Sequence, residues 1–127
     1  MKRAVGVAMG ATMLATGAAL VGSAGTAQAA VECGSGMVCI YPQKNYGGTP
    51  YVRRASDGNV KLSDKPINDQ TYSVINNSSD RTARIYRNSS YGGSHTCIRP
   101  GGRIGDLESY PVGHWGSSLK INKDACG

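Results

Sequence analysis

The sequence lacks sustained helical periodicity after Ala30. Short runs rich in Val, Ile, Tyr and Thr occur there instead, separated by Gly, Asn, Asp and Ser. Runs of this kind are typical of β-strands joined by tight turns, whereas a helix needs a longer stretch with apolar residues every three or four positions. The sequence therefore predicts an all-β protein.

Recognisable catalytic motifs are also missing. There is no G-x-S-x-G nucleophile elbow, and the glycine-rich stretches "YGGS" and "PGGRIG" lack the Lys-Ser/Thr ending of a phosphate-binding loop. The two histidines, His95 and His114, have no partner pattern around them and are interpreted as surface or packing residues. We therefore expect a binding protein and not an enzyme.

The first 29 residues have the features of a secretory signal peptide. A basic head, Met1-Lys2-Arg3, precedes an uncharged run from Ala4 to Gly25, and Ala27-Gln28-Ala29 forms a small-x-small cleavage site. A membrane anchor is the alternative, but the run is rich in Gly and Ala and only weakly apolar. We expect cleavage after Ala29 and secretion of residues 30–127 as one extracellular domain, a monomer without membrane attachment.

Residues 30–127 have little excess charge. Without Lys2 and Arg3 they carry 12 basic and 8 acidic side chains, a net charge of +4. Arg53-Arg54 is the only adjacent basic pair in this part. A nucleic-acid-binding protein usually has a denser basic stripe, so we expect no nucleic-acid partner, but some attraction to acidic surfaces.

The four cysteines include no C-x-x-C pair, which disfavours a zinc site. An even number of cysteines in a secreted domain predicts two disulfides. Cys33 and Cys39 are separated by a segment, Gly34-Ser35-Gly36, that allows a turn tight enough for a local bond. This pairing leaves Cys97 with Cys126, and we predict both bonds.

The sequence contains an internal repeat. "IYPQKNYGG" at residues 40–48 returns as "IYRNSSYGG" at residues 85–93, an offset of 45. The same offset superimposes Ser73 on Ser118 and Val74 on Leu119. Two copies are therefore predicted, at about 37–79 and 82–124. One copy alone would leave an apolar sheet face exposed, so we expect the two to pack as a sandwich.

Strands are expected wherever an apolar run lies between turn residues, and residues 76–80 (NNSSD) are expected to join the two halves. The expected strands are Met37–Tyr41, Pro50–Arg54, Tyr72–Asn76, Ala83–Tyr86, His95–Arg99 and Ser117–Ile121.

Each copy of the repeated motif predicts the same local structure. The first tyrosine ends a strand, and the second folds back over the turn after that strand. The last glycine, Gly48 or Gly93, supplies a backbone conformation with positive φ that a side chain would disfavour.

The duplicated pattern resembles the βγ-crystallin Greek-key superfamily, whose signature is aromatic-x4-aromatic-x-Gly followed by a late serine. The resemblance covers residues 37–122 and implies two Greek-key repeats packed as one sandwich domain. The residues that carry it are Tyr41, Tyr46, Gly48 and Ser73 in the first copy, and Tyr86, Tyr91, Gly93 and Ser118 in the second.

The opening of the domain is more specific. Cys33, Gly36, Cys39 and Tyr41 match the C-x-x-G-x-x-C-aromatic start of small secreted bacterial metalloproteinase inhibitors of the same fold. The resemblance implies a secreted protease inhibitor with an extracellular protease as its partner. Because the fold also hosts calcium binders and structural proteins, an extracellular structural or weakly calcium-binding module is the alternative.

Calcium-binding members of the superfamily carry Asn/Asp-Asn/Asp-x-x-Ser/Thr-Ser in each copy, and ligands are exchanged between copies. Here the two segments read "NDQTYS" at residues 68–73 and "GHWGSS" at residues 113–118. Asp69 with Ser117 retains oxygen ligands of the kind that Ca²⁺ prefers, whereas His114 with Tyr72 does not. We therefore expect no required cofactor and at most one weak calcium site.

The candidate protease-contact segment is "HTCIRPGGR", residues 95–103. Its Thr96-Cys97-Ile98-Arg99 part is similar to a Thr-Cys-aliphatic-Arg stretch of the metalloproteinase inhibitors, which implies Ile98 as the main contact. Cys97 and Pro100 are expected to act as braces, and Arg99 would instead suit a trypsin-like enzyme. The inhibitors have another Cys a few residues later that this chain lacks, and a buried strand with a structural disulfide is the alternative interpretation.

Overall fold

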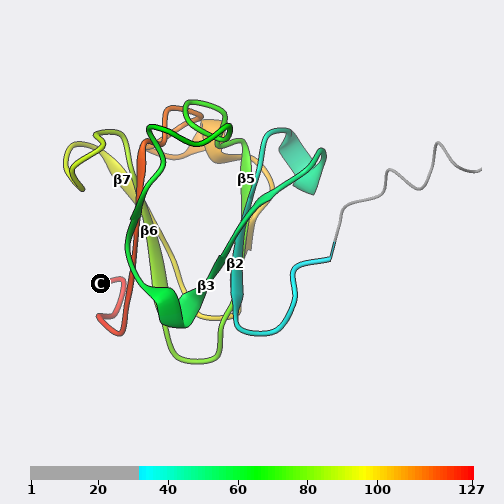
Figure 1. The fold of residues 1–127 in the computed structure, drawn as a ribbon, viewed down its shortest axis with the longest axis vertical. Coiled ribbons are helices and arrows are strands. Elements are labelled where there is room, and N and C mark those ends of the chain that lie inside the picture. The colour runs from blue at the N-terminus through cyan, green and yellow to red at the C-terminus, as the bar shows by residue number, and fades with distance from the viewer. Residues whose placement is uncertain (1–31) are drawn as a thin grey trace, which may run out of the picture.

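The computed structural model describes residues 32–127 (Figure 1). The predicted signal peptide, residues 1–29, lies outside the described residues, so its cleavage stays a prediction. Within 32–127, no helix is long and apolar enough to cross a membrane.

Within residues 32–127, eight strands form two four-stranded sheets in which all neighbouring strands are antiparallel. The first sheet has the order β3 (Tyr51–Arg54), β2 (Met37–Tyr41), β5 (Ser73–Asn77) and β8 (Arg103–Ile104). The second sheet has the order β4 (Val60–Lys61), β9 (Ser118–Asn122), β6 (Thr82–Tyr86) and β7 (His95–Ile98).

The two predicted repeats pack face to face, but each repeat also gives a strand to the other sheet. β8 comes from the second repeat and pairs with β5 of the first, while β4 comes from the first and pairs with β9 of the second. All six predicted strands are present, with ends shifted by one residue at most. The sequence prediction missed β4 and β8 because two residues are too short to show an alternating pattern.

In the described part of the chain, three short 3₁₀ helices occupy the connections: η2 (Lys44–Tyr46), η3 (Ala55–Asp57) and η4 (Leu107–Ser109). They turn the chain at places where the prediction had only loops.

The core lies between the two sheets and is filled by aliphatic side chains from alternate strand positions. Leu62, Ile67, Leu107 and Val112 close it from the connecting segments. The strand residues that fill it are Val38, Ile40, Val74, Ala83, Ile85, Ile98, Leu119 and Ile121.

The repeated motif has the predicted structure in both copies. The rings of Tyr41 and Tyr46 meet edge to face with centroids 5.8 Å apart, and those of Tyr86 and Tyr91 do the same at 6.5 Å. The last glycine of each motif has φ of 79°. At Gly48 a Cβ would lie 2.7 Å from Cγ of Pro42, so its lack of a side chain matters for space as well as for φ.

The late serines hold these motifs closed. Ser73 Oγ donates to the Gln43 carbonyl at 2.6 Å and accepts from the Tyr46 N–H at 2.9 Å. In the second copy, Ser118 Oγ donates to the Asn88 carbonyl at 2.5 Å and accepts from the Tyr91 N–H at 3.1 Å. The two serines are fully buried, so their role in the fold is structural.

A second, smaller apolar cluster covers the outside of the first sheet, around Cys39, Tyr41 and Ile75. Burial raises the pKa of the Tyr41 hydroxyl. The Cys33–Cys39 disulfide belongs to this cluster and ties the start of the described chain to β2.

Both predicted disulfides are confirmed. Cys33 pairs with Cys39, and Cys97 of β7 pairs with Cys126 in the C-terminal segment. Arg84 also binds this segment through the carbonyl of Ala125, so residues 123–126 lie against the outside of the second sheet.

Replacement of either late serine by alanine should destabilise the domain. Ser118→Ala leaves the Tyr91 N–H and the Asn88 carbonyl without their partner, and we expect a loss of about 1–3 kcal/mol in the free energy of unfolding. Ser73→Ala should cost a similar amount, because its bonds are equivalent. Denaturant unfolding measures both, with the exposed Ser63→Ala as control. Equal stability of Ser118→Ala and the control would contradict the structural role.

The two disulfides should contribute unequally. The half-cystines are 29 residues apart in Cys97–Cys126 and 6 apart in Cys33–Cys39. In the chain-entropy model these loops correspond to about 3.5 and about 2 kcal/mol. The double alanine variant at residues 97 and 126 should therefore melt at a lower temperature than the variant at 33 and 39. The reverse order in calorimetry would refute this ranking.

Candidate functional site

The candidate protease-contact segment crosses from one sheet to the other. β7 is an edge strand of the second sheet, β8 is an edge strand of the first, and residues 99–102 join them. The Gly102 N–H donates to the Arg99 carbonyl at 2.9 Å, and Gly101 has φ of 76°. With Pro100 in the second position this is the pattern of a type II turn. Arg99, Pro100 and Gly101 are all exposed at its tip.

Asn76 of β5 fixes this turn from below. Its backbone N–H donates to the Gly102 carbonyl at 2.9 Å, and its carbonyl accepts from the Gly101 N–H at 2.8 Å. Its side-chain amide, which is fully buried, donates to the carbonyls of Ile98 at 3.0 Å and Arg81 at 2.8 Å. The turn is therefore exposed at its tip and rigid at its base. Asn76 lies at the end of a strand expected from the sequence, and no sequence pattern indicates its role at the turn.

The structure contradicts Ile98 as the main protease contact. Its side chain is 2% exposed and lies in the core, opposite Ala83 of β6. Side chains alternate along a strand, so the disulfide at Cys97 on the outside requires Thr96 and Ile98 to point inward. The alternative interpretation, a buried strand with a structural disulfide, is correct for this residue. Arg99 and Pro100 remain accessible, and Cys97 is half-buried.

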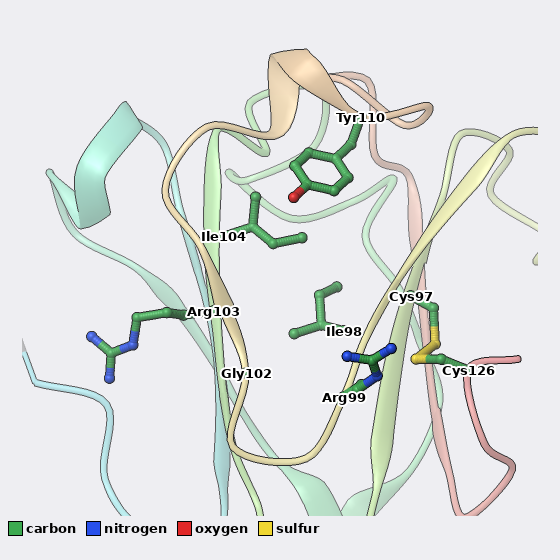
Figure 2. A pocket seen from close by; sticks show the side chains of 8 residues that line it. All are labelled: Cys97, Ile98, Arg99, Gly102, Arg103, Ile104, Tyr110 and Cys126. Carbon is green, nitrogen blue, oxygen red and sulfur yellow. A yellow bond between two sulfur atoms is a disulfide. The ribbon is translucent and has the colours of Figure 1, made fainter.

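A hollow of about 320 Å³ lies beside the turn, between the edges of the two sheets. Figure 2 shows Ile98 and Ile104 pointing toward each other across it, with Tyr110 above and the Cys97–Cys126 disulfide at one side. Tyr110 is 45% exposed, although it is a large aromatic side chain. We call this hollow, the turn 99–102 and Tyr110 the seam surface.

The seam surface is basic. Arg99 and Arg103 both line the hollow, and neither forms an ion pair with any carboxylate in residues 32–127. Arg103 extends away from the isoleucines in Figure 2, and its guanidinium carbon lies 5.4 Å from the ring centroid of Tyr46. Arg99 is therefore the cation at the tip of the turn that is available to a partner.

The two halves of the predicted calcium site lie together at the opposite end of the sandwich from the linker. Ser117 Oγ donates to Asp69 Oδ1 at 3.4 Å. Asn68 Oδ1, from the neighbouring residue, is buried and has no hydrogen-bond partner. Asp69 and Ser117 therefore bring together two oxygens of the kind that Ca²⁺ prefers. Across residues 32–127, no group of three or more His, Cys, Asp or Glu side chains is arranged to hold a metal.

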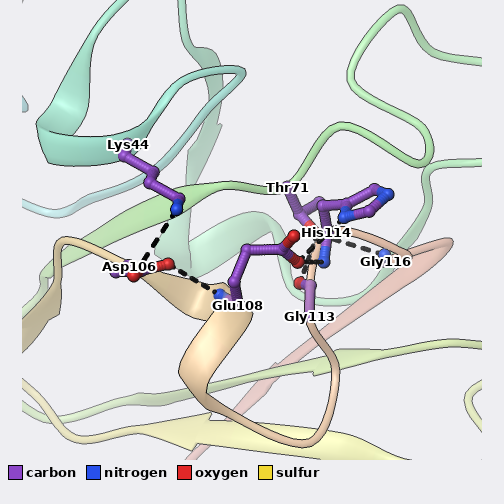
Figure 3. A network of polar contacts seen from close by, with 7 residues as sticks. All are labelled: Lys44, Thr71, Asp106, Glu108, Gly113, His114 and Gly116. Atoms are coloured by element: carbon purple, nitrogen blue, oxygen red, sulfur yellow. Dashed lines mark hydrogen bonds and ion pairs between the residues drawn. The ribbon is translucent and has the colours of Figure 1, made fainter.

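The equivalent position in the other half is filled by aromatic rings. Tyr72 and His114, the residues expected to make a poor calcium site, stack with centroids 4.9 Å apart and planes 8° apart. Glu108 Oε1 accepts from the His114 backbone N–H at 3.1 Å and lies 2.8 Å from its Nδ1 (Figure 3). Ring stacking and the Glu108 contacts therefore hold the loop around His114.

Figure 3 also shows how this loop is fixed to its surroundings. Thr71 Oγ1 donates to the Gly113 carbonyl at 3.2 Å and accepts from the Gly116 N–H at 3.1 Å. Asp106 Oδ1 accepts from the Glu108 N–H at 3.0 Å, while Lys44 pairs with the same aspartate at 3.7 Å. The sequence analysis missed Glu108, because only the fold brings it to His114.

Comparison with solved structures identifies the fold. A domain described under the evolution of the eye lens βγ-crystallin fold is 20% identical, with a TM-score of 0.64, over 75% of this chain and 94% of that one. The calcium-bound βγ-crystallin domain of Abundant Perithecial Protein from Neurospora crassa is 15% identical, with a TM-score of 0.59, over 77% and 100%. A βγ-crystallin domain from Clostridium beijerinckii is 24% identical, with a TM-score of 0.56, over 68% and 98%.

These similarities show that the protein has the βγ-crystallin Greek-key fold. Residues 26–98 match the model of peptidase inhibitor family I36. The match spans more than half of the chain, so the chain belongs to this family, and its class is that of a protease inhibitor. A search of curated proteins finds no match.

Proposed function

We propose that this protein inhibits an extracellular metalloprotease through the seam surface. The observation that carries the proposal is the turn 99–102, which combines an exposed tip with a backbone fixed by Asn76 and Gly102. A rigid binding surface loses little conformational entropy when it is bound, which favours tight inhibition. The two disulfides support action outside the cell, where such bonds persist.

The turn suits a steric block better than a substrate-like cleavage site. The Arg99 carbonyl already accepts the Gly102 N–H, so it is not free to meet a catalytic zinc or an oxyanion hole. Pro100 has no N–H to pair with the enzyme. The partner would therefore meet the turn without cleaving it, and the buried Ile98 would support the surface instead of entering a pocket.

The metalloprotease target rests on the similarity of Cys33–Tyr41 and Thr96–Arg99 to the bacterial metalloproteinase inhibitors. With Ile98 buried, Tyr110 is the apolar side chain of the seam surface that can anchor a partner, and Arg99 is the charged one. Tyrosine and arginine often dominate the binding energy of protein interfaces.

A protease panel tests the proposal. We expect inhibition of a thermolysin-like enzyme by residues 30–127 and weaker or no inhibition of subtilisin-like and trypsin-like enzymes. Arg99→Ala and Tyr110→Ala should each raise Ki about tenfold or more, because each removes a central contact. The matched controls, Arg54→Ala and Val52→Ala, change exposed side chains of β3 and should leave Ki unchanged.

The outcomes of the panel separate the function from its site. No inhibition of any enzyme at micromolar concentration would end the inhibitor proposal for these protease classes. If neither Arg99→Ala nor Tyr110→Ala weakens inhibition, the protein is an inhibitor but the seam surface is not where the protease binds. Stronger inhibition of the trypsin-like enzyme, lost in Arg99→Ala, would replace the metalloprotease by a serine protease.

The second candidate function is that of an extracellular module that binds one calcium ion weakly. It is favoured by the Asp69 and Ser117 oxygens, which lie 3.4 Å apart, and by the buried, unpartnered Oδ1 of Asn68, the residue before Asp69. When bound, Ca²⁺ would neutralise the Asp69 carboxylate and link the 68–70 loop to residue 117. Such a role needs no protease partner and is compatible with the fold.

Calcium titration should therefore show one site at most, with Kd on the order of 10⁻⁴–10⁻³ M. Trp115 is the single tryptophan and lies two residues from Ser117, so its fluorescence offers a readout beside calorimetry. Asp69→Ala should abolish the signal, whereas Asp64→Ala, another loop carboxylate, should retain it. Two equal tight sites would show that the Tyr72–His114 stack does not replace a cation.

A further inference from the structure

The strands of the second sheet direct cations to its outer face, where the C-terminal segment adds one acidic side chain, Asp124. Ile85 and Leu119 point into the core, so the alternate residues of these strands point outward. None of the strands β4, β6, β7 and β9 contains Asp or Glu. We define the basic face by its outward side chains, which are Lys61, Arg84, Tyr86, His95, Lys120 and the adjoining Tyr91.

The cations of this face are arranged in rows across the strands. One row runs from Lys61 through Ser118 and Tyr86 to His95. In the next row Arg84 lies directly opposite Lys120. Like charges in this arrangement are destabilising, and opposite charges would be the favourable choice for stability alone. Arg84 holds the C-terminal segment through two carbonyls, whereas no ion pair within residues 32–127 accounts for Lys61 and Lys120 on the same face.

No ion pair within residues 32–127 neutralises these side chains. Lys120 Nζ lies 5.6 Å from the ring centroid of Tyr86 and 5.9 Å from that of Tyr91. Arg84 donates to the carbonyl of Ala125, which carries no charge. Asp124 of the C-terminal segment accepts from Thr82 and Arg84 through its carbonyl but forms no ion pair within residues 32–127, and Asp80 pairs with Lys123. The basic face keeps its positive potential as a result.

The same face also presents aromatic rings. Tyr86 lies 4.9 Å from His95 and 6.5 Å from Tyr91, as measured between ring centroids. His95 is exposed, and both tyrosines are partly exposed. Aromatic rings beside cations on an open sheet face suit a chain of sugar rings that bears acidic groups, since the rings contact the apolar sugar faces and the cations bind the acids.

We infer that the basic face binds an acidic polysaccharide. The rows cross four strands about 4.8 Å apart, so an extended polymer can meet several cations at once. The face is formed by the outside of the sheet, whereas the turn 99–102 joins its edge strand to the other sheet. Binding here does not depend on protease inhibition, and it would hold the protein at a surface rich in such polymers.

The test uses residues 30–127 and polygalacturonate as the acidic probe, with neutral dextran as its control, in calorimetry at low salt. We expect binding to polygalacturonate that weakens as NaCl rises, since salt screens exposed charges, and none to dextran. Lys61→Glu with Lys120→Glu should weaken binding more than tenfold. The matched control is Arg54→Glu with Lys65→Glu, which changes the net charge equally but away from this face, and it should weaken binding less than about threefold.

Circular dichroism and melting temperature establish that both double variants are folded, and Lys61→Ala with Lys120→Ala provides a milder change if the glutamates unfold the sheet.

Equal losses in the face and control variants would show a net-charge effect and overturn the site. No binding of the wild type to polygalacturonate at low salt would overturn it too. Tighter binding to duplex DNA or to phosphatidylglycerol vesicles would assign the face to another class of partner. Protease inhibition measured on the same variants should not change.

Discussion

The hydrogen bonds of Asn76 hold the two halves of the domain in their relative positions. Its side-chain amide reaches the end of β7 and the linker carbonyl of Arg81, while its backbone binds both glycines of the turn 99–102. Ser78 donates through its N–H and its hydroxyl to the Asn76 Oδ1, so every polar atom of this buried side chain has a partner. A buried amide with unmet hydrogen bonds would be costly, and this full set explains why a polar side chain lies beneath the seam surface.

Much of the fold follows from the repeat. The periodicity of 45 residues, the six strands, the positive φ of Gly48 and Gly93 and both disulfide pairs agree with the structure. The exchange of β4 and β8 between the sheets was not predictable from alternation, because each strand has two residues and its pairing depends on contacts far apart in the chain. The sequence therefore predicts the two repeats, whereas the sheet that β4 or β8 joins depends on how the repeats pack against each other.

The candidate site was predictable only in part. The exposed turn at Arg99 and Pro100 lies where the sequence predicted a contact segment. The residue expected to make the main contact, Ile98, points into the core instead. The disulfide at Cys97 could have indicated the correct direction, since it requires an outward side chain and thereby turns Ile98 inward. Tyr110 reaches the hollow beside this turn only because of the path that the chain takes after β8. No local sequence pattern indicates that Tyr110 belongs to the site.

The two copies have diverged most where ligands would be shared. Asp69 and Ser117 keep two oxygens side by side, while Tyr72 and His114 place two rings in the related position. The Tyr72–His114 stack is supported by Glu108, which accepts from the His114 N–H. The two related positions at this end of the sandwich therefore differ, with polar oxygens in one and aromatic rings in the other.

The exchange of β4 and β8 also determines how the domain responds to a cut in the backbone. If the linker after Asn77 were severed, each fragment would still contribute a strand to the sheet of the other, and the common core would remain between them. Each disulfide lies within a single fragment, Cys33–Cys39 in the first and Cys97–Cys126 in the second, so neither bond would join the two fragments covalently. The exchanged strands would hold the fragments together without a covalent link. A single nick in that joint would therefore leave an assembled molecule.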